Sequence, residues 1–423
     1  MKNLLKFTAF IFLLTNVVVA QKNRGIFGET NWTENWTNYK PKSTFYRETE
    51  FVLNGDLKEN TTLSRKNCYL IAGNVVVKSG ATLTIESGTI IKGDYATTGS
   101  LIIEQGAKII AEGSETNPIV FTSNRAISDR NPGDWGGIII LGKAPVNKLG
   151  GKQILDLNEM FTFGGSDIAD NSGVLKYVRI EFAGKRLKGK YAFDALTLAG
   201  VGNMTKIENV QTSFSQKNGF SFLGGNLKVT KLVSFKNYIH DYNFNAGTNT
   251  TITNSLAFRF PNYSDASYSN ALNVQSYDDI TQFDFSKKST TVKAANLTII
   301  SLDDEKLGNV REAIYVAENT NFTFTKSIIH GFSPAILLDK RIESAKLNNI
   351  VIQNMLFNQC KDAIVHDVPN FSANLVDLYG AENFLNEFKM LDITELLSVP
   401  DFKSNSNFGL KVSVDNNVVI KYK

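Results

Sequence analysis

The chain has 423 residues, 42% hydrophobic and 20% charged, so it can build a packed core and is not a disordered polymer. Its formal net charge is only +4, which argues against nucleic acid as a partner. It contains only 3 histidines, which leave little room for a histidine metal site or a histidine relay.

The first twenty residues have the pattern of an export signal. Lys2 and Lys6 flank the start of an apolar run, and Ala20 supplies a small residue before Gln21. The run is too short to predict a membrane span. We therefore assign residues 1–20 to a signal peptide. We expect the mature chain, without a transmembrane span, in the periplasm, on the outer-membrane surface or outside the cell.

Residues 21–50 are polar and aromatic and include the near-repeat NWTENWT, with Trp32 and Trp36 four residues apart. This spacing would place both rings on one face of a helix, but the Thr and Asn content favours an extended or looped segment. Because the terminal coil of a solenoid exposes open strand edges, we expect this segment to act as an N-terminal cap.

The stretch from Val75 to Gly142 contains the clearest repeat. ATLTIESGTIIKG and GSLIIEQGAKIIAEG are two copies of one unit, in which Leu83 corresponds to Leu101. Apolar residues alternate with polar ones and glycines separate the runs, a pattern typical of short strands joined by turns. A repeat of about 20 residues indicates a solenoid, whose interior should contain Leu83, Ile85, Leu101 and Ile103.

The second half of the chain repeats at a longer interval. The segments ALTLAG, GFSFLGG, YNFNAG, ALNVQS, AIYVAE, AILLDK and AIVHDV each open a unit, and a second series of strands follows them. Residues 143–172 predict an irregular excursion, and the charged insertions 278–288 and 303–311 predict exposed loops. Residues 383–397 are the one plausible helix, and the final NNVVIKYK predicts a closing strand.

These patterns predict an all-β parallel β-helix with four parts. They are a signal peptide (1–20), an N-terminal cap (21–50), the β-helix (51–370) and a short helix and strand extension (371–423). Cys68 and Cys360 lie near opposite ends of the predicted rod, so we expect two buried free thiols rather than a disulfide.

Several segments, in order, resemble a family of secreted or surface β-helix proteins. They are IESGTIIKGD, KIIAEGSETNPIVFTS, GDWGGIIILGKAPVN, NSGVLKYVRIEFAG, LTLAGVG and SDASYSNAL. The family is largely uncharacterised and occurs in Gram-negative bacteria of the type IX secretion group. The resemblance covers about residues 32–367. It implies a right-handed parallel β-helix related in shape to pectate lyases, and it implies no particular activity.

The chain departs from this family at one informative place. Family members usually carry acidic clusters in three consecutive coils, where this chain has QKNGFSFLGG, IHDYNFNAG and ALNVQSYDD. Calcium requires several charged oxygen ligands, so we expect no metal ion here, and no cofactor. We expect the remaining polar side chains to form one binding face: Lys217, Ser221, His240, Asp241, Asn243, Asn273 and Gln275. Replacing Lys217, Asp241 and Asn273 together by Ala should leave the fold intact.

Other candidate residues have a structural and a functional interpretation. Trp135 in GDWGG could stack on a sugar, but its flanking glycines favour a constrained turn. His240 and Asp241 could be a general base and its orienter, but adjacent strand residues point to opposite faces. Asp278-Asp279 and Asp303-Asp304-Glu305 could serve a glycosidase-like site, although solvated loops are favoured.

The repeated aromatic residues favour ladders stacked inside the coil. They are Phe220, Phe222, Phe235, Tyr242, Phe244, Phe258 and Phe260.

No nucleophile–base pair stands out, so we expect no catalytic residue. The leading hypothesis is a non-catalytic β-helix, at the cell surface or associated with the outer membrane. It would act as a binding or assembly subunit for a protein of the cell envelope or a glycan. The alternative is a polysaccharide lyase or glycoside hydrolase on a pectate-lyase-like β-helix, for which Arg259 is the basic residue we would nominate. A weaker third hypothesis is an adhesin. Fold alone cannot decide among them.

Overall fold

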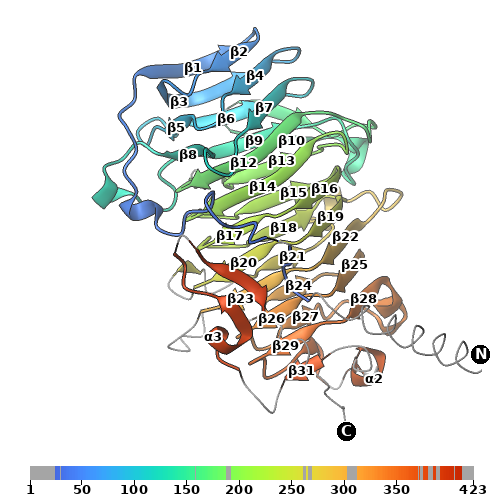
Figure 1. Cartoon of the computed structure of the whole chain (residues 1–423). Coiled ribbons are helices and arrows are strands. Elements are labelled where there is room, and N and C mark those ends of the chain that lie inside the picture. The colour runs from blue at the N-terminus through green and yellow to red at the C-terminus, as the bar shows by residue number, and fades with distance from the viewer. Residues whose placement is uncertain are drawn as a thin grey trace, which may run out of the picture.

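The protein is described by a computed structural model. It covers residues 24–411 except 29, 158, 187–191, 261–262, 265–268, 303–311, 370, 372–374, 380–383, 387–390 and 404. Within these residues, 29 strands form one sheet that coils into a rod (Figure 1). Strands in successive coils pair in parallel, as Leu196 does with Phe220 and Phe220 with Tyr242. The predicted fold class, an all-β parallel β-helix, is confirmed.

The strands stack in three ladders, which we call faces A, B and C. Face A contains β2 (Thr61–Leu63), β4 (Thr82–Ile85), β7 (Lys108–Glu112), the first parts of β12 (Gly173–Glu181) and β14 (Lys206–Ser213), β16 (Asn226–Thr230), β19 (Asn249–Thr253), β22 (Thr290–Ala295), β25 (Thr320–Thr325) and β28 (Ile350–Gln353).

Face B begins with β1 (Phe51–Leu57) and the first part of β3 (Cys68–Val77). It continues with β5 (Ile90–Gly93), β8 (Ile119–Ser123), the second parts of β12 and β14, β17 (Val233–Phe235), β20 (Leu256–Arg259), β23 (Thr298–Ser301), β26 (Ile328–His330), β29 (Leu356–Asn358) and β31 (Phe384–Asn386).

Face C starts at the second part of β1, whose residues Gly55–Leu57 pair with the second part of β3. It continues with β6 (Ser100–Ile103), β9 (Gly137–Leu141), β13 (Leu196–Ala199), β15 (Phe220–Leu223), β18 (Tyr242–Asn245), β21 (Leu272–Val274), β24 (Ile314–Val316), β27 (Ile336–Leu338) and β30 (Ile364–His366). The seven repeat segments recognised in the sequence correspond to β13, β15, β18, β21, β24, β27 and β30.

A single left-handed residue makes the corner between faces A and B in coil after coil. These residues are Tyr177, Asn209, Lys231, Asn254, Asn296, Lys326 and Asn354, with φ between 50° and 59°. Asn enters this region more readily than most residues, which explains its frequency there.

The interior contains the residues expected from the repeat. Leu83, Ile85, Leu101 and Ile103 are all buried in one core cluster, as predicted. The correspondence of Leu83 with Leu101, however, relates two faces of the coil. Leu83 on face A pairs with Ile109, 26 residues later, whereas Leu101 lies on face C and pairs with Val75.

The aromatic residues divide between the inside and the outside of the coil. Phe220 stacks on Tyr242 inside, with ring centroids 5.4 Å apart, which confirms the ladder there. Phe235 and Phe258 instead belong to a separate apolar cluster on the outer side of face B, so the prediction was wrong for them. Tyr39 from the N-terminal segment covers both rings.

The segment 24–46 lies along face B and does not cap the end of the rod. Arg24 donates a hydrogen bond to the carbonyl oxygen of Asn354, near the C-terminal end of the coils, and Tyr46 donates to Glu181. The segment therefore runs back along several coils, and the expected end cap is corrected (Figure 1). The segment packs there because the outer side of face B is apolar, and covering it removes that apolar surface from water. It also contains a 3₁₀ turn, η1 (Pro41–Ser43).

The C-terminal part packs against the last coils and, through its final hairpin, against this segment, where Asn31 donates a hydrogen bond to the carbonyl oxygen of Ser406. It contains α2 (Leu375–Tyr379), α3 (Ile393–Leu396) and the hairpin of β32 (Leu397–Val399) and β33 (Asn407–Leu410). The helix predicted over 383–397 was wrong, because β31 occupies its start and α3 only its end. The closing strand and the signal peptide lie outside the described residues. The domain boundaries therefore stay predictions.

Insertions protrude from the corners of the coil. The excursion 143–172 holds the 3₁₀ turn η3 (Leu149–Gly151) and the hairpin of β10 (Gln153–Asp156) and β11 (Met160–Phe163). The loop 278–288 is largely exposed, as predicted, whereas 303–311 lies outside the described residues. Short 3₁₀ turns complete the inventory: η2 (Ile127–Asp129), η5 (Ile280–Gln282) and η6 (Ser344–Asn349).

Cys68 and Cys360 are buried free thiols, as predicted. In the part of the chain that the structure describes, no helix is long and apolar enough to cross a membrane.

Candidate functional site

Trp135 in the GDWGG motif is a core residue. It is fully buried, its ring stacks on Phe121, and its Nε1 donates a hydrogen bond to the carbonyl oxygen of Glu181 at 2.8 Å. Asp134 accepts hydrogen bonds from the Ser123 hydroxyl and the Asn131 backbone amide. The structural interpretation is confirmed, and Trp135 cannot stack on a sugar.

Three residues of the predicted binding face lie one above another on the outer side of face C. Ser221, Asn243 and Asn273 are in register. Asn273 donates a hydrogen bond to Asn243 Oδ1 at 2.8 Å, and Asn243 donates to Ser221 Oγ at 3.4 Å. Their clustering is as predicted, but the amides largely satisfy one another, and Ser221 is fully buried.

Lys217 and Gln275 border this column. The Lys217 ammonium lies 3.4 Å from Oδ1 of Asp194 and donates to the carbonyl oxygen of Ala192. Gln275 donates to Asp278 at 2.6 Å. Sequence reasoning did not single out Asp194, because it is an isolated acidic residue immediately before an apolar strand. Whether this face binds a partner stays a prediction.

Asp241 lies inside the coil. One carboxylate oxygen accepts a hydrogen bond from Ser234, and the other lies 3.5 Å from Nη1 of Arg259; both charged side chains are fully buried. Burial raises the pKa of Asp241 to about 6, and Arg259 and Ser234 oppose the rise. Asp241 precedes the strand that begins at Tyr242, so the alternation of side chains along that strand does not determine which way the Asp241 side chain points.

The burial of Asp241 and Arg259 inside the coil corrects two expectations, one about the triple substitution and one about Arg259 as a catalytic base. Removing Asp241 would leave the Arg259 charge uncompensated in the core, so the planned triple substitution would not leave the fold intact. Arg259, at 1% exposure, cannot reach a substrate outside the coil.

His240 does not work with Asp241 as a base and its orienter. Its Nδ1 accepts a hydrogen bond from the backbone amide of Asn270 at 3.4 Å, while Asp241 bonds to Ser234. Burial lowers the pKa of His240 to about 3, and the nearby Arg259 and Lys217 charges act in the same direction. His240 is therefore a neutral, structural residue at physiological pH.

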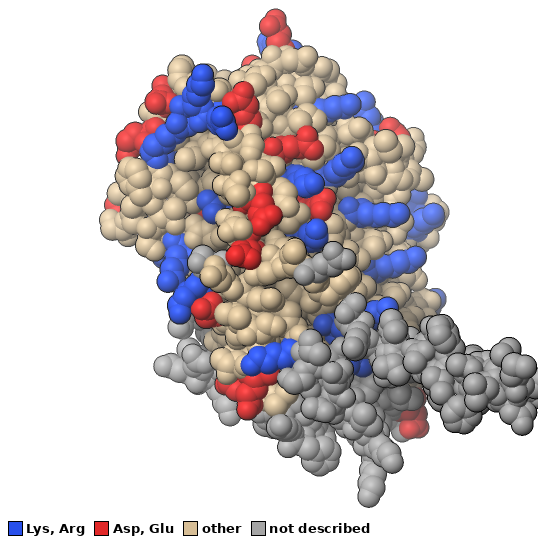
Figure 2. All heavy atoms as spheres, viewed as in Figure 1, with Lys and Arg blue, Asp and Glu red and all other residues tan. Residues whose placement is uncertain are grey.

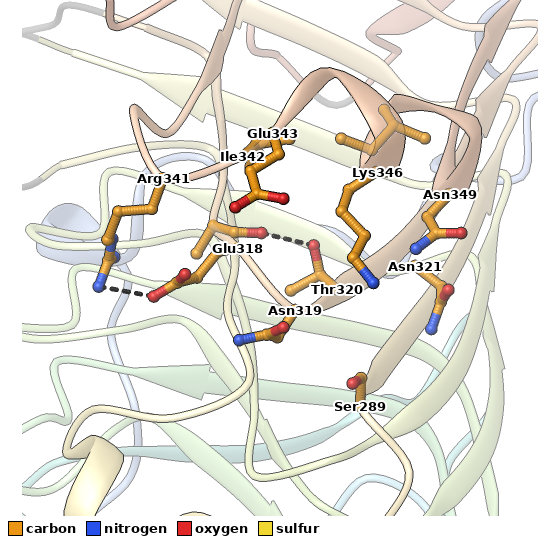
Figure 3. A pocket seen from close by; sticks show the side chains of 12 residues that line it. Ser289, Glu318, Asn319, Thr320, Asn321, Arg341, Ile342, Glu343, Lys346 and Asn349 are labelled. Atoms are coloured by element: carbon orange, nitrogen blue, oxygen red, sulfur yellow. Dashed lines mark hydrogen bonds and ion pairs between the residues drawn. The ribbon is translucent and has the colours of Figure 1, made fainter. Parts of the chain in front are cut away.

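Two adjoining recesses lie at the corner where the chain passes from face C to face A. The larger, about 500 Å³, lies between the excursion 143–172 and the loop 278–289. The smaller, about 210 Å³, is bounded by the segment 341–350 (Figure 3). Ser289 lines both, and we call the pair the corner recesses.

One column of polar side chains runs through both recesses. Asn226, Asn249, Thr291 and Asn321 occupy matching positions on β16, β19, β22 and β25. Asn249 donates to Asn226 Oδ1 at 3.1 Å, and Asn321 donates to Thr291 Oγ1 at 3.3 Å. We call these four residues the polar ladder. Sequence reasoning missed it.

Charged and aromatic side chains surround the corner recesses. In the smaller one, the Lys346 amine points toward Asn321 and Asn349, and Glu318 pairs with Arg341 at 2.9 Å (Figure 3). Lys287 and Lys288 line the larger one. Phe285, next to this lining in the chain, is 68% exposed.

No cluster of three or more His, Cys, Asp or Glu side chains among the described residues could hold a metal ion. The expected absence of a tight calcium site stays a prediction, which a calcium titration would test.

Residues 55–385 match the pectate-lyase-like β-helix domain family. The chain belongs to this family. None of the curated proteins compared with it matches.

Solved structures similar to this pectate-lyase-like chain include pectate lyase Pel9A, at 10% identity and a TM-score of 0.34, covering 86% of this chain and 90% of that one. The enzymatically active domain of bacteriophage CBA120 tailspike protein 2 is 11% identical, with a TM-score of 0.23, covering 71% and 38%. The Dettilon tailspike protein is 11% identical, with a TM-score of 0.25, covering 75% and 62%. Likenesses this distant carry no argument about activity.

Proposed function

We propose that this pectate-lyase-like β-helix is a non-catalytic carbohydrate-binding protein whose site is the corner recesses. The observation that carries the proposal is the polar ladder, which places an amide or a hydroxyl in each of four consecutive coils at the floor of an open hollow. Each coil adds about 4.8 Å along the axis, so the ladder suits an elongated ligand of repeating polar units.

The chemistry of the recesses matches sugar hydroxyl groups. Amides and hydroxyls both donate and accept hydrogen bonds, as sugar hydroxyls do. The exposed ring of Phe285, the chain neighbour of the lining residue Ser286, offers an apolar surface, and sugar rings have apolar faces. Lys287, Lys288 and Lys346, which line the recesses, can donate further hydrogen bonds to sugar hydroxyl groups.

The contacts of Glu318 in the smaller recess do not favour catalysis. Glu318 accepts a hydrogen bond from the Tyr277 hydroxyl at 2.6 Å and pairs with Arg341, so both contacts hold it in a structural role. Proton abstraction requires a positioned base whose pKa is tuned to the reaction. These contacts support binding over the lyase or hydrolase alternative.

The location of the protein is part of the proposal. The export signal and the resemblance to surface proteins of the type IX secretion group support a place in the periplasm, on the outer-membrane surface or outside the cell. An envelope glycan is the partner that we propose. A protein of the cell envelope is the alternative partner.

The test is a glycan array probed with the exported form of the chain, followed by chromatography of each bound oligosaccharide after prolonged incubation. We expect binding to extended oligosaccharides, which are recovered at full length. Shortened or unsaturated products would support the enzymatic alternative, and failure to retain any glycan would contradict the proposal.

A further inference from the structure

Lysines gather on the outer side of face A, in the column next to the polar ladder. Along β14, β16, β19, β22 and β25, the second outward column contains Lys206, Lys228, Thr251, Lys293 and Thr323. The A–B corner adds Lys231 and Lys326. Figure 2 shows basic side chains on the side where Figure 1 labels β16, β19 and β22. We call Lys206, Lys228, Lys231, Lys293 and Lys326 the lysine face.

Acidic side chains do not balance this charge. Glu208 is the acidic residue on the outward side of these five strands among the described residues, and it pairs with Lys231 at 3.6 Å and Lys176 at 3.9 Å. Lys206 and Lys228 are exposed, and neither pairs with an acid in the described part of the chain. The face thus carries a positive excess comparable to the formal charge of the whole chain, +4.

The arrangement of the lysines carries an energetic cost. The register of Ile207 with Val229 places Lys206 directly beside Lys228 on the neighbouring strand. Like charges at directly opposed positions destabilise a sheet. The outward neighbours here are largely threonines, which would fit either position without repulsion. The lysines of this face therefore keep positive charge concentrated at some cost in stability, as expected of a surface that meets an anionic partner.

We propose that the lysine face binds an anionic lipid surface. It is the outer surface of a sheet rather than a channel, and its outward column consists of lysine and threonine and contains no aromatic side chain. Binding of single-stranded nucleic acid uses aromatic stacking, and specific phosphate recognition favours Arg over Lys. Lysine point charges on a flat surface suit diffuse attraction to lipid headgroups.

This proposal is independent of carbohydrate binding, because the lysine column lies beside the polar ladder and shares no residue with it. Membrane attachment through the lysine face would leave the corner recesses at the edge of the contact, open to a ligand.

The test is co-sedimentation of the exported chain with vesicles of phosphatidylcholine alone or mixed with phosphatidylglycerol, at low and at high salt. We expect binding to the mixed vesicles only, and its loss at high salt. The variant Lys206→Gln/Lys228→Gln/Lys293→Gln should bind at least tenfold more weakly. Lys40→Gln/Lys361→Gln/Lys403→Gln, which removes the same charge elsewhere, should bind as the natural chain does.

Equal weakening by both triple variants would show that net charge, not this face, is responsible. Equal binding to neutral vesicles, or no binding to either kind, would overturn the proposal. So would salt-sensitive retention of DNA or a soluble acidic polysaccharide without retention of vesicles. Circular dichroism melting of both variants checks that the fold is unchanged.

Discussion

Asn321 donates a side-chain hydrogen bond to the Thr291 hydroxyl, one coil away, at 3.3 Å. The rest of its amide makes no hydrogen bond to the described residues and lines the smaller corner recess (Figure 3). The contact fixes the direction of the side chain and leaves polar groups for a ligand. Ser221, Asn243 and Asn273 form a similar column on face C, but there the amides are largely used up by their neighbours.

Ile103→Asp should destabilise the protein by several kcal/mol, because Ile103 is fully buried and the new charge would have no partner. Thermal unfolding followed by circular dichroism measures the effect. Ile110→Asp is the control, since Ile110 is half-buried on the outer side of face A and should cost much less. An unchanged melting temperature for Ile103→Asp would contradict the register.

Trp36→Ala should loosen the N-terminal segment from face B. Trp36 is fully buried and packs edge-on against Tyr177, and loss of a buried Trp costs about 3–5 kcal/mol. Trp32→Ala, at the half-buried neighbour, should cost less than half as much. Urea unfolding gives both values. Similar small losses would mean that the segment contributes little to stability.

Asp241 should make stability depend on pH. Because burial raises its pKa from 3.8 to about 6, the folded protein holds a proton that the unfolded chain releases between these values. The free energy of unfolding should therefore fall as the pH rises through this range, by on the order of 3 kcal/mol from this group. Asp241→Asn should remove that part of the slope. Urea titrations of both proteins between about pH 4 and pH 7 test this, and parallel curves would refute it.

Calcium should not bind tightly to the column on face C. Its outward side chains are a hydroxyl and amides, whereas calcium sites need several charged oxygens. Isothermal titration calorimetry should show no micromolar site in the natural chain. A site of that affinity, lost in Asn243→Ala or Asn273→Ala, would contradict the account.

The ladders could be predicted from the sequence because each coil repeats its apolar pattern. The seven repeat segments, from ALTLAG to AIVHDV, all contain strands of face C, and Leu83 and Leu101 are interior residues. The coil length was misjudged near the N-terminus, because two faces of one coil have similar sequences there.

Long-range contacts could not be predicted. Phe235 and Phe258 repeat like interior residues, and only the chain ends, through Tyr39 and Phe408, show that they lie outside. The pairing of Asp241 with Arg259 depends on the path of a corner, not on a strand period. The corner recesses depend on insertions whose shapes the sequence does not specify.

The most direct test of the central claim is calorimetric titration of a glycan retained on the array. The variant Asn249→Ala/Asn321→Ala removes two steps of the polar ladder. Thr253→Ala/Thr325→Ala is the control, since it alters the same two strands, β19 and β25, outside the corner recesses. We predict at least tenfold weaker binding for the first variant and unchanged binding for the second, with both folded. Equal affinities for the two variants would contradict the assignment of the site to the corner recesses.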